Sequence, residues 1–380
     1  MMHTNPKIFI IAGEASGDAN AAGLVTDIAA FNRNVTFSGI GGRRLQEANV
    51  KIIHEYSTIN YIGFSNVLKN IVKIKSVLKN SVEYVKKEYP DAIILVDFPG
   101  FNLKFAETVR KFYKGKIFYY ISPQIWAWHK SRIKKIRKYI DRMLVIFPFE
   151  VEFYKNLGYD ADYVGHPLIK RIDEFLCDNK KMGTDNLKVT LLPGSRIEEI
   201  KRIFPVLADV SEKIRHEFKA EISLIYPDYI GPVVYKDILK GKTCSLIANS
   251  GISHYNTLIN SDLVITKFGT TTLELGLLGV PFLSVYKAGL SNYLIAKSLS
   301  DIKYVSMPNI LMKKEIVKEL IQYDFTCSKI LEESEKILTN SNYRNNMLEN
   351  FSQMKKIFYE TPIPKTGAEI IIEELNNSKL

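Results

Sequence analysis

Short apolar runs alternate with longer amphipathic segments along the whole chain. In the first half, the runs fall at 7–11, 35–38, 92–97, 116–121, 143–147 and 162–164. In the second half, they fall at 187–192, 222–226, 245–248, 262–266 and 281–286. Continuous apolar runs of this length are typical of strands buried on both faces, and amphipathic segments are typical of helices. The pattern therefore predicts an α/β protein with two doubly wound parallel sheets, each covered by helices.

A change of composition separates the two series of strands. Gly165-His166-Pro167-Leu168 ends the first series, and the polar stretch 178–186 follows as a candidate linker. We therefore expect a first domain over 1–168 and a second over 169–354, with a cleft between them. A helix at about 355–380 is a candidate to pack back on the first domain.

Composition narrows the class of protein. The chain has 46% hydrophobic and 24% charged residues, as in a soluble globular protein, and no apolar run of about 18 residues that would span a membrane. The start of the chain lacks the pattern of a secretion signal. Three cysteines, far apart, argue against a disulfide framework or a cysteine metal site. A reducing cytoplasm fits these observations.

The net charge of +11 indicates an anionic partner, and nucleic acid, a lipid surface or a phosphorylated metabolite all fit it. Two segments, 66–80 and 130–142, carry lysines and arginines around an apolar helical face. Each is either a surface helix packed on its own domain or a helix that contacts a membrane.

An acidic, glycine-flanked turn, Gly13-Glu14-Ala15-Ser16-Gly17-Asp18, directly follows the first predicted strand. A helix is predicted over 19–30, with Ser16 or Asp18 as its N-cap. Ligands of open α/β sheets bind at the carboxyl ends of strands, so this turn is placed to contact a substrate. The candidate contacts are Glu14, Ser16 and Asp18. The alternative is an ordinary turn whose aspartate only caps a helix.

Two turns of the second half suit a nucleotide. Backbone amides around Gly194 and Ser195, with the guanidinium of Arg196, can cradle a diphosphate. After a later strand, three hydroxyls begin a helix, and a glutamate one turn on can accept ribose hydroxyls. These residues are Thr270, Thr271, Thr272 and Glu274. The alternative is that the threonines are only helix caps. Two such turns in one domain favour nucleotide binding.

Several longer motifs resemble those of the lipid-A-disaccharide synthase family, which are glycosyltransferases of lipid A assembly. They are Ile11-Ala12-Gly13-Glu14-Ala15-Ser16-Gly17-Asp18, Gly39-Ile40-Gly41-Gly42, Val96-Asp97-Phe98-Pro99-Gly100-Phe101-Asn102, Ser122-Pro123-Gln124-Ile125-Trp126-Ala127-Trp128, Val164-Gly165-His166-Pro167-Leu168, Leu192-Pro193-Gly194-Ser195-Arg196, 269–274 and Met307-Pro308-Asn309. The resemblance covers nearly the whole chain, and the first and fourth motifs are the most specific. Two positions depart from the family pattern: Phe268 replaces a small residue and Arg43 replaces a common proline.

The resemblance implies a GT-B type fold, in which two Rossmann-like domains face a cleft and the C-terminal domain holds UDP. It implies a hexosyltransferase that joins UDP-2,3-diacylglucosamine to 2,3-diacylglucosamine 1-phosphate (lipid X) by a β-1,6 bond, releasing UDP. The resemblance also gives the key acidic role to Asp97.

The chemistry is consistent with that assignment. A β-glycoside formed from an α-linked sugar nucleotide requires inversion, and hence a base on the acceptor hydroxyl. Asp97 ends an apolar strand; its alternative role is to cap the following turn. Arg196 and helix N-termini can stabilise the leaving UDP, so we expect neither metal nor cofactor. Trp126 is a candidate for the acceptor entrance or for the core. Further expected substrate contacts are Tyr286, Asn309 and Gln322.

Acylated substrates suit a peripheral enzyme on the cytoplasmic face of the inner membrane, bound to anionic lipid through the basic segments. A homodimer is an open alternative to a monomer. One competing function is a UDP-N-acetylglucosamine 2-epimerase of the same fold, which would need no apolar acceptor surface. The other is a nucleic-acid-binding protein without enzymatic activity, but no recognised binding motif supports it, and we expect no nucleic acid partner.

Overall fold

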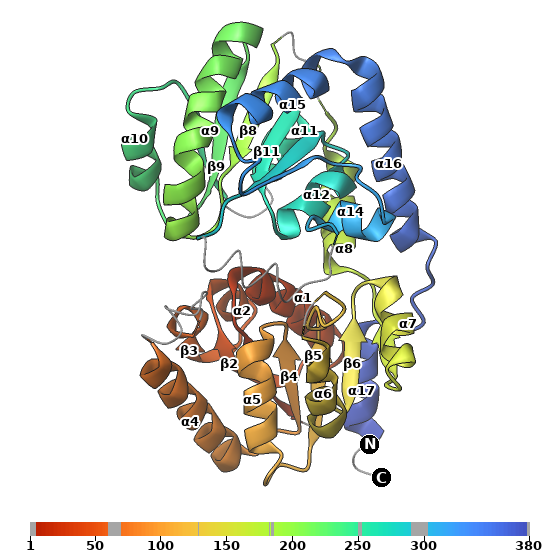
Figure 1. Cartoon of the computed structure of the whole chain (residues 1–380). Coiled ribbons are helices and arrows are strands. Elements are labelled where there is room, and N and C mark those ends of the chain that lie inside the picture. The colour runs from red at the N-terminus through yellow and green to blue at the C-terminus, as the bar shows by residue number, and fades with distance from the viewer. Residues whose placement is uncertain are drawn as a thin grey trace. The chain divides into compact units, whose positions relative to one another are not determined.

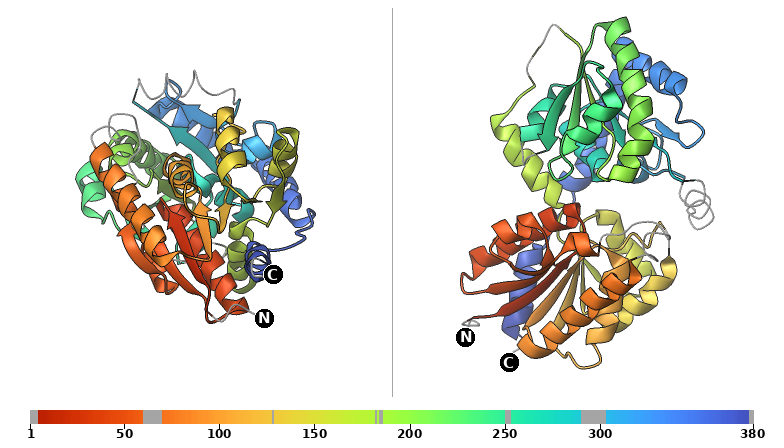
Figure 2. Two further views of the ribbon diagram at one scale, coloured as in Figure 1. Left: turned by 90° about the horizontal axis from the view of Figure 1, so that it is seen from below. Right: turned by 90° about the vertical axis from the view of Figure 1, so that its left-hand side faces the viewer.

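The computed structural model describes residues 5–59, 70–127, 129–181, 183, 186–249, 253–289 and 303–377. These residues form two compact units: 5–167 with 361–377, and 168–289 with 303–360. Each unit contains one parallel β-sheet (Figure 1) with helices on both of its faces (Figure 2). The predicted class, α/β with two doubly wound parallel sheets, is confirmed.

The sheet of the first unit has the order β3-β2-β1-β4-β5-β6-β7, and all its pairs are parallel. The strands are β1 Lys7–Ala12, β2 Thr36–Gly41, β3 Lys51–Glu55, β4 Ala92–Val96, β5 Lys116–Tyr120, β6 Arg142–Val145 and β7 Ala161–Tyr163. The order reverses between β1 and β4, which pair directly. Ligands of doubly wound sheets bind at the carboxyl ends of the two strands that flank such a reversal.

The helices of the first unit are α1 Ala15–Phe31, α2 Arg43–Glu47, α4 Ile71–Glu88, α5 Pro99–Val109, α6 Ile133–Tyr139, α7 Pro148–Asn156 and α17 Gly367–Asn377, with the short 3-10 helices η1 Tyr56–Thr58 and η2 Lys130–Arg132. The last helix, α17 (blue in Figure 1), comes from the far end of the chain and packs against α1. Its Glu374 pairs with Arg142 at 3.2 Å and Lys116 at 3.0 Å. The end of the chain therefore belongs to the first unit.

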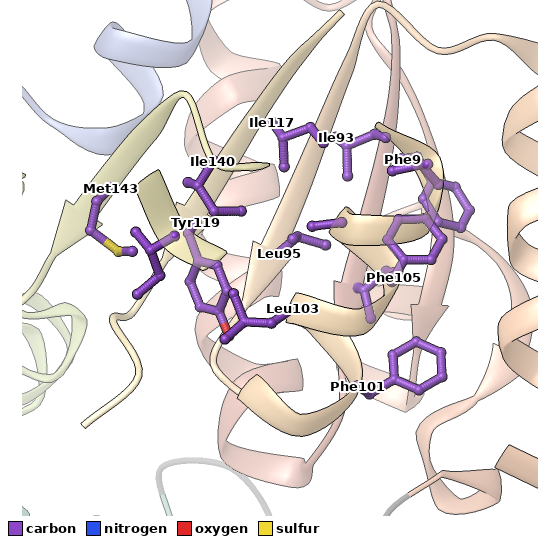
Figure 3. Close-up of a cluster of buried hydrophobic side chains, with 14 of the residues drawn as sticks. Phe9, Ile93, Leu95, Phe101, Leu103, Phe105, Ile117, Tyr119, Ile140 and Met143 are labelled. Atoms are coloured by element: carbon purple, nitrogen blue, oxygen red, sulfur yellow. The ribbon is translucent and has the colours of Figure 1, made fainter. Parts of the chain in front are cut away.

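Side chains on one face of the first sheet form a continuous core with α4, α5 and α6. Figure 3 shows Phe9 of β1 beside Phe105 of α5, and Tyr119 of β5 beside Leu103 of the same helix. The apolar side of the predicted basic helix 130–142 joins this core, since Ile133, Ile136 and Ile140 are buried. That segment is therefore a helix packed on its own domain, and its apolar side is closed to a membrane.

The second predicted basic helix, over 66–80, lies only partly within the described residues, because positions 66–69 fall outside them. In the described part, α4 begins at Ile71, and Ile74 and Leu78 pack against the core. Val72 is 76% exposed and Ile71 is 38% exposed. Of the helices in the described ranges, none is long and apolar enough to cross a membrane.

The sheet of the second unit has the order β10-β9-β8-β11-β12-β13, again entirely parallel. The strands are β8 Lys188–Leu192, β9 Glu221–Pro227, β10 Ser245–Asn249, β11 Leu263–Lys267, β12 Phe282–Tyr286 and β13 Glu319–Ile321. The helices are α8 Pro167–Asp178, α9 Ile197–Phe218, α10 Val233–Leu239, α11 Ser253–Ile259, α12 Thr270–Leu278, α14 Met307–Met312, α15 Cys327–Thr339 and α16 Ser341–Tyr359. Here the strand order reverses between β8 and β11.

Candidate functional site

The acidic turn after β1 lies beside the turn after β4. A Cβ atom on Gly13 would approach the ring of Phe98 to 2.2 Å, so only glycine allows this contact. Helix α1 begins at Ala15 with Glu14 as its N-cap residue, and the prediction of Ser16 or Asp18 as that cap is wrong. The hydroxyl of Ser16 donates to the carboxylate of Glu14 at 2.6 Å. Glu14 and Ser16 therefore lie at the sheet reversal, where a ligand is expected.

Asp18 has a different environment from its two neighbours. It is only 3% exposed, and its carboxylate accepts hydrogen bonds from the amides of Gly42 at 2.6 Å, Arg44 at 3.0 Å and Leu45 at 3.4 Å. These amides belong to the first turn of α2 and the residue before it. Asp18 therefore caps α2 and ties the β1 turn to the β2 turn, and its contact with substrate stays a prediction.

Asp97 directly follows β4 and has an unusual backbone. Its φ is +45°, and that of Phe98 is +46°, a left-handed conformation that costs non-glycine residues free energy. The side-chain amide of Asn102 and the hydroxyl of Tyr119 both donate to the main-chain carbonyl of Asp97. Side chains from α5 and β5 thus hold a turn that the backbone alone would disfavour.

The carboxyl group of Asp97 is suited to accept a proton near neutral pH. It keeps some solvent contact, but the surrounding protein raises its pKa to about 7, and the nearby charge of Glu14 acts in the same direction. The backbone amide of Phe98 and the charge of Arg132 oppose this shift of the pKa. A base is most effective when its pKa lies near the working pH. Arg132, which sequence reasoning missed, is therefore part of this site's electrostatics.

Trp126 forms a hydrogen bond with a buried carboxylate in the same unit. Its indole N–H donates to Glu150 at 3.2 Å, and its ring meets Phe149 edge to face at 5.3 Å. Glu150 is 1% exposed, accepts the amide of Phe147 at 3.1 Å, and has its pKa raised to about 7 by burial. Sequence reasoning missed Glu150; its signal was a glutamate three residues after the start of a helix, the place of a capping box. Trp128 lies outside the described residues.

In the second unit, the glycine loop after β8 carries the predicted diphosphate contacts. Gly194 has φ of +133°, Ser195 is exposed, and the carbonyl of Ser195 accepts the hydroxyl of Tyr229 at 2.8 Å. Arg196 donates to Glu199 at 3.2 Å. These residues lie at the carboxyl end of β8, on the side of the sheet reversal. Amides and a guanidinium at such a loop suit a phosphate ligand.

The threonine turn after β11 lies on the neighbouring strand, and its hydroxyls differ in access. Thr270 is exposed and Thr271 partly exposed, whereas Thr272 is fully buried and donates to the carbonyl of Gly269 at 2.8 Å. Glu274 accepts the hydroxyl of Tyr255 at 2.8 Å and the guanidinium of Arg171 at 3.2 Å. Thr270 and Thr271 are thus the open members of the predicted set, and the carboxylate of Glu274 is held by two side chains.

Asn309 and Gln322 brace the backbone around them. Asn309 is fully buried, and its side chain bonds the main chain of Ile316 and Val317 at distances of 2.8 to 3.0 Å. Gln322 bonds both the amide and the carbonyl of Ala288, at 3.0 and 3.2 Å. Their contacts with substrate stay predictions.

Tyr286 ends β12, the strand that pairs with β11. Its ring lies 5.7 Å from the ring of Phe268, which departs from the family pattern, and 5.7 Å from the ammonium of Lys267. Lys267 was not predicted as a site residue, because a single lysine at the end of a strand carries no distinctive signal. Within the described ranges, no group of three or more His, Cys, Asp or Glu residues is placed to hold a metal ion.

Comparison with known proteins gives a consistent result along the chain. The model of the lipid-A-disaccharide synthetase family matches residues 8–362. The lipid-A-disaccharide synthase of Geobacter sulfurreducens is 33% identical over 385 aligned positions, which cover 98% of each chain. That of Myxococcus xanthus is 32% identical, with 98% of this chain and 99% of the relative covered.

Solved structures with a similar fold are much more distant in sequence. The UDP-GlcNAc 2-epimerase of Neisseria meningitidis, bound to UDP-GlcNAc, superposes with a TM-score of 0.64 at 12% identity, covering 98% of this chain and 100% of that one. The calicheamicin glycosyltransferase CalG4 gives a TM-score of 0.60 at 13% identity, covering 99% and 98%. These likenesses show the fold, which is of the GT-B type, and do not favour an epimerase over a transferase.

Proposed function

The chain belongs to the lipid-A-disaccharide synthase family, and from that premise we propose that it transfers 2,3-diacylglucosamine from its UDP derivative to lipid X. The enzyme is a glycosyltransferase of lipid A biosynthesis. The proposed product is a β-1,6-linked disaccharide 1-phosphate, released together with UDP. The family match over nearly the whole chain carries this proposal, and the position and pKa of Asp97 support it.

In the proposed reaction, the oxygen of the 6-hydroxyl of lipid X attacks the anomeric carbon of the donor. Asp97 accepts the proton that this hydroxyl loses. The bond between that carbon and the diphosphate breaks in the same step, and its electron pair leaves with UDP. Inversion converts the α-linked donor into a β-glycoside. The raised pKa of Asp97 makes the carboxylate a stronger base than an ordinary aspartate, while it is still ionised above about pH 7.

The other site residues have roles on one substrate or the other. Glu14, Ser16 and Trp126 lie in the first unit and are proposed to contact the acceptor. The loop at Gly194, Ser195 and Arg196 is proposed to take the diphosphate and stabilise the charge that UDP gains as it leaves. The remaining proposed donor contacts are Thr270, Thr271, Thr272, Glu274, Tyr286, Asn309 and Gln322.

We further propose that the enzyme works on the cytoplasmic face of the inner membrane as a peripheral protein. Both substrates are acylated, and α4 offers an exposed apolar residue, Val72, next to lysines at 73 and 75 that are also exposed. Apolar side chains in the headgroup region with lysines at the phosphates give reversible attachment to an anionic surface.

The test of the proposed function is a reconstituted reaction. Purified protein is incubated with UDP-2,3-diacylglucosamine and lipid X, and the products are identified by mass spectrometry. We expect a disaccharide 1-phosphate and equimolar UDP, only when both substrates are present. Epimerisation of the sugar nucleotide without acceptor would instead support the isomerase alternative, and the absence of any product would refute the transferase.

A further inference from the structure

A lysine at the end of β11 reaches the loop that follows β8. The two strands are neighbours, with Thr266 opposite Leu192, so the next residue, Lys267, lies beside the start of that loop. Its ammonium is 3.1 Å from the carboxylate oxygen Oε1 of Glu199. Arg196 approaches the same oxygen, at 3.2 Å. Two cations, one at the end of β11 and one at the start of α9, therefore converge on one oxygen at the carboxyl ends of the strands of the second sheet.

Lys267 and Arg196 both contact one oxygen of Glu199, beside the glycine loop that is expected to hold a phosphate. Glu199 supplies one negative charge to the pair of cations, and its second oxygen, Oε2, is buried without a hydrogen-bond partner in the part of the chain that the structure describes. That oxygen lies under the glycine loop, 3.0 Å from where a Cβ of Gly194 would be. Opposite charges this close attract strongly when they are partly shielded from water. Both cations lie at the carboxyl ends of β8 and β11, where the strand order reverses and a ligand is expected to bind.

The position of Lys267 is also fixed from its other side. The ammonium lies over the ring of Tyr286, 5.7 Å from its centroid, and the side chain is only 16% exposed. A cation over an aromatic face is attracted by the electron density of the ring. The lysine is thus already held in one place, which reduces the entropy that binding a ligand would cost.

We propose that Lys267 is a second phosphate-binding cation of the nucleotide-sugar site, which contacts the donor diphosphate together with Arg196. Glu199 holds both cations until the diphosphate replaces it as their partner. A diphosphate carries negative charge on both phosphate groups, and two cations that meet at one oxygen are close enough to contact neighbouring phosphates. The assignment rests on the proposed function, because it takes UDP as part of the donor.

The competing explanation is purely structural. In it, the ion pair between Lys267 and Glu199 only fastens β11 to α9, and the lysine contributes stability but no affinity. The two explanations differ in what they predict for ligands with different numbers of phosphates. A phosphate-binding lysine matters most for UDP, less for UMP and not for uridine, whereas a structural lysine affects all three alike.

The experiment is calorimetric titration of UDP, UMP and uridine into the full-length protein and into Lys267→Met. We expect Lys267→Met to weaken UDP binding about 10-fold or more, the scale of one charged hydrogen bond, with a smaller loss for UMP. The control is Lys242→Met, because Lys242 also pairs with a carboxylate of α9, Asp209 at 2.5 Å, but precedes β10 at the amino end of the sheet. It should bind UDP as the unmodified protein does.

A lower melting temperature of Lys267→Met with an unchanged dissociation constant for UDP would overturn the assignment and support the structural explanation. If Lys267→Met does not fold, the double variant Lys267→Met with Glu199→Gln also removes the charge of the carboxylate that has lost one of its two cationic partners. That variant should fold and still bind UDP about 10-fold more weakly or worse, again the scale of one charged hydrogen bond; normal affinity would refute the proposal. An unmodified protein that fails to bind UDP would refute the proposed function itself.

Discussion

The side-chain amide of Asn102 donates a hydrogen bond of 2.7 Å to the main-chain carbonyl of Asp97, and it also reaches the carbonyl of Val96 at 3.2 Å. Asp97 and Phe98 both have left-handed backbones, a conformation that persists in non-glycine residues only where the surroundings enforce it. Asn102 is fully buried on the first turns of α5. The direction of the proposed base therefore depends on this asparagine.

Replacing Asn102 with Ala should reduce both stability and turnover. We expect a loss of about 1–3 kcal/mol in the free energy of unfolding, because the substitution removes the hydrogen bonds of Asn102 to the carbonyls of Val96 and Asp97 and leaves only Tyr119 as a side-chain donor to Asp97. Turnover should fall about 10-fold or more as the turn loosens, because catalysis is sensitive to small errors in the position of a base. UDP affinity should not change. The control is Asn350→Ala in α16, a buried asparagine whose side chain, within the described part of the chain, donates to Asn346 of the same helix; this variant should lose stability without loss of turnover.

Asp97→Asn should fold and bind UDP normally but turn over at least about 100-fold more slowly, the usual scale for losing a general base. The measurement is the single-turnover rate with saturating donor and acceptor. Asp91→Asn is a matched control, because Asp91 precedes the same strand, β4, at its amino end and accepts the amide of Lys7. Near-normal turnover of Asp97→Asn would remove Asp97 from the mechanism.

The raised pKa of Asp97 predicts a pH dependence of both rate and stability. The base must be ionised, so kcat/KM should rise with pH and level off above about pH 7, and Asp97→Asn should lack this rise.

The same pKa predicts how stability depends on pH. An unfolded aspartate has a pKa of about 3.9, so between about pH 4 and pH 7 the folded protein binds more protons than the unfolded protein does. The contribution of Asp97 to stability therefore decreases as pH rises through that window. Asp97→Asn should gain in melting temperature relative to the unmodified protein from about pH 5 to pH 8. A constant difference would contradict the raised pKa.

Glu150 should titrate in the same pH range, and the fluorescence of Trp126 should change as it does. Burial raises the pKa of Glu150 to about 7, and its carboxylate accepts the indole N–H. The chain has two tryptophans, so Trp128→Phe leaves Trp126 as the single tryptophan. In that background, we expect the fluorescence of Trp126 to change with a midpoint near pH 7, and the change to disappear in Glu150→Gln. A transition that survives this substitution would assign the titration to another group.

Much of the fold could be predicted from the sequence, because buried parallel strands consist of continuous apolar runs. The two strands that were not predicted, β3 and β13, lie at the edges of their sheets, where strands are less buried. Ile52 and Ile53 in β3 are only half-buried, and β13 has three residues. Edge strands of this kind have no long apolar run to mark them.

For the site residues, the position in an element was easier to predict than the contacts with distant parts of the chain. The place of Asp97 directly after an apolar strand was predictable, and its role as the base stays a prediction. The contacts of Glu150 and Lys267 were not predictable, because their partners, Trp126 and Glu199, are distant in the sequence and approach only in the folded protein. The carboxylate of Asp18 accepts the amides of Gly42 and Arg44, which the sequence did not indicate because they come from another turn, and its contact with substrate stays a prediction.

The exposed start of α4 is proposed to attach the enzyme to an anionic membrane. The double variant Ile71→Ser with Val72→Ser should reduce binding to phosphatidylglycerol vesicles severalfold and raise the apparent KM for lipid X, since apolar contacts in the headgroup region are lost. UDP affinity should not change, and the melting temperature should change little, because Val72 is 76% exposed and Ile71 also lies on the exposed start of the helix, at 38%. The matched control is Val82→Ser, on the buried side of the same helix, which should lower the melting temperature.

High salt should weaken vesicle binding of the unmodified protein, because salt screens the attraction between the lysines of α4 and the anionic lipid. Unchanged vesicle binding in the double variant would show that the membrane contact lies elsewhere.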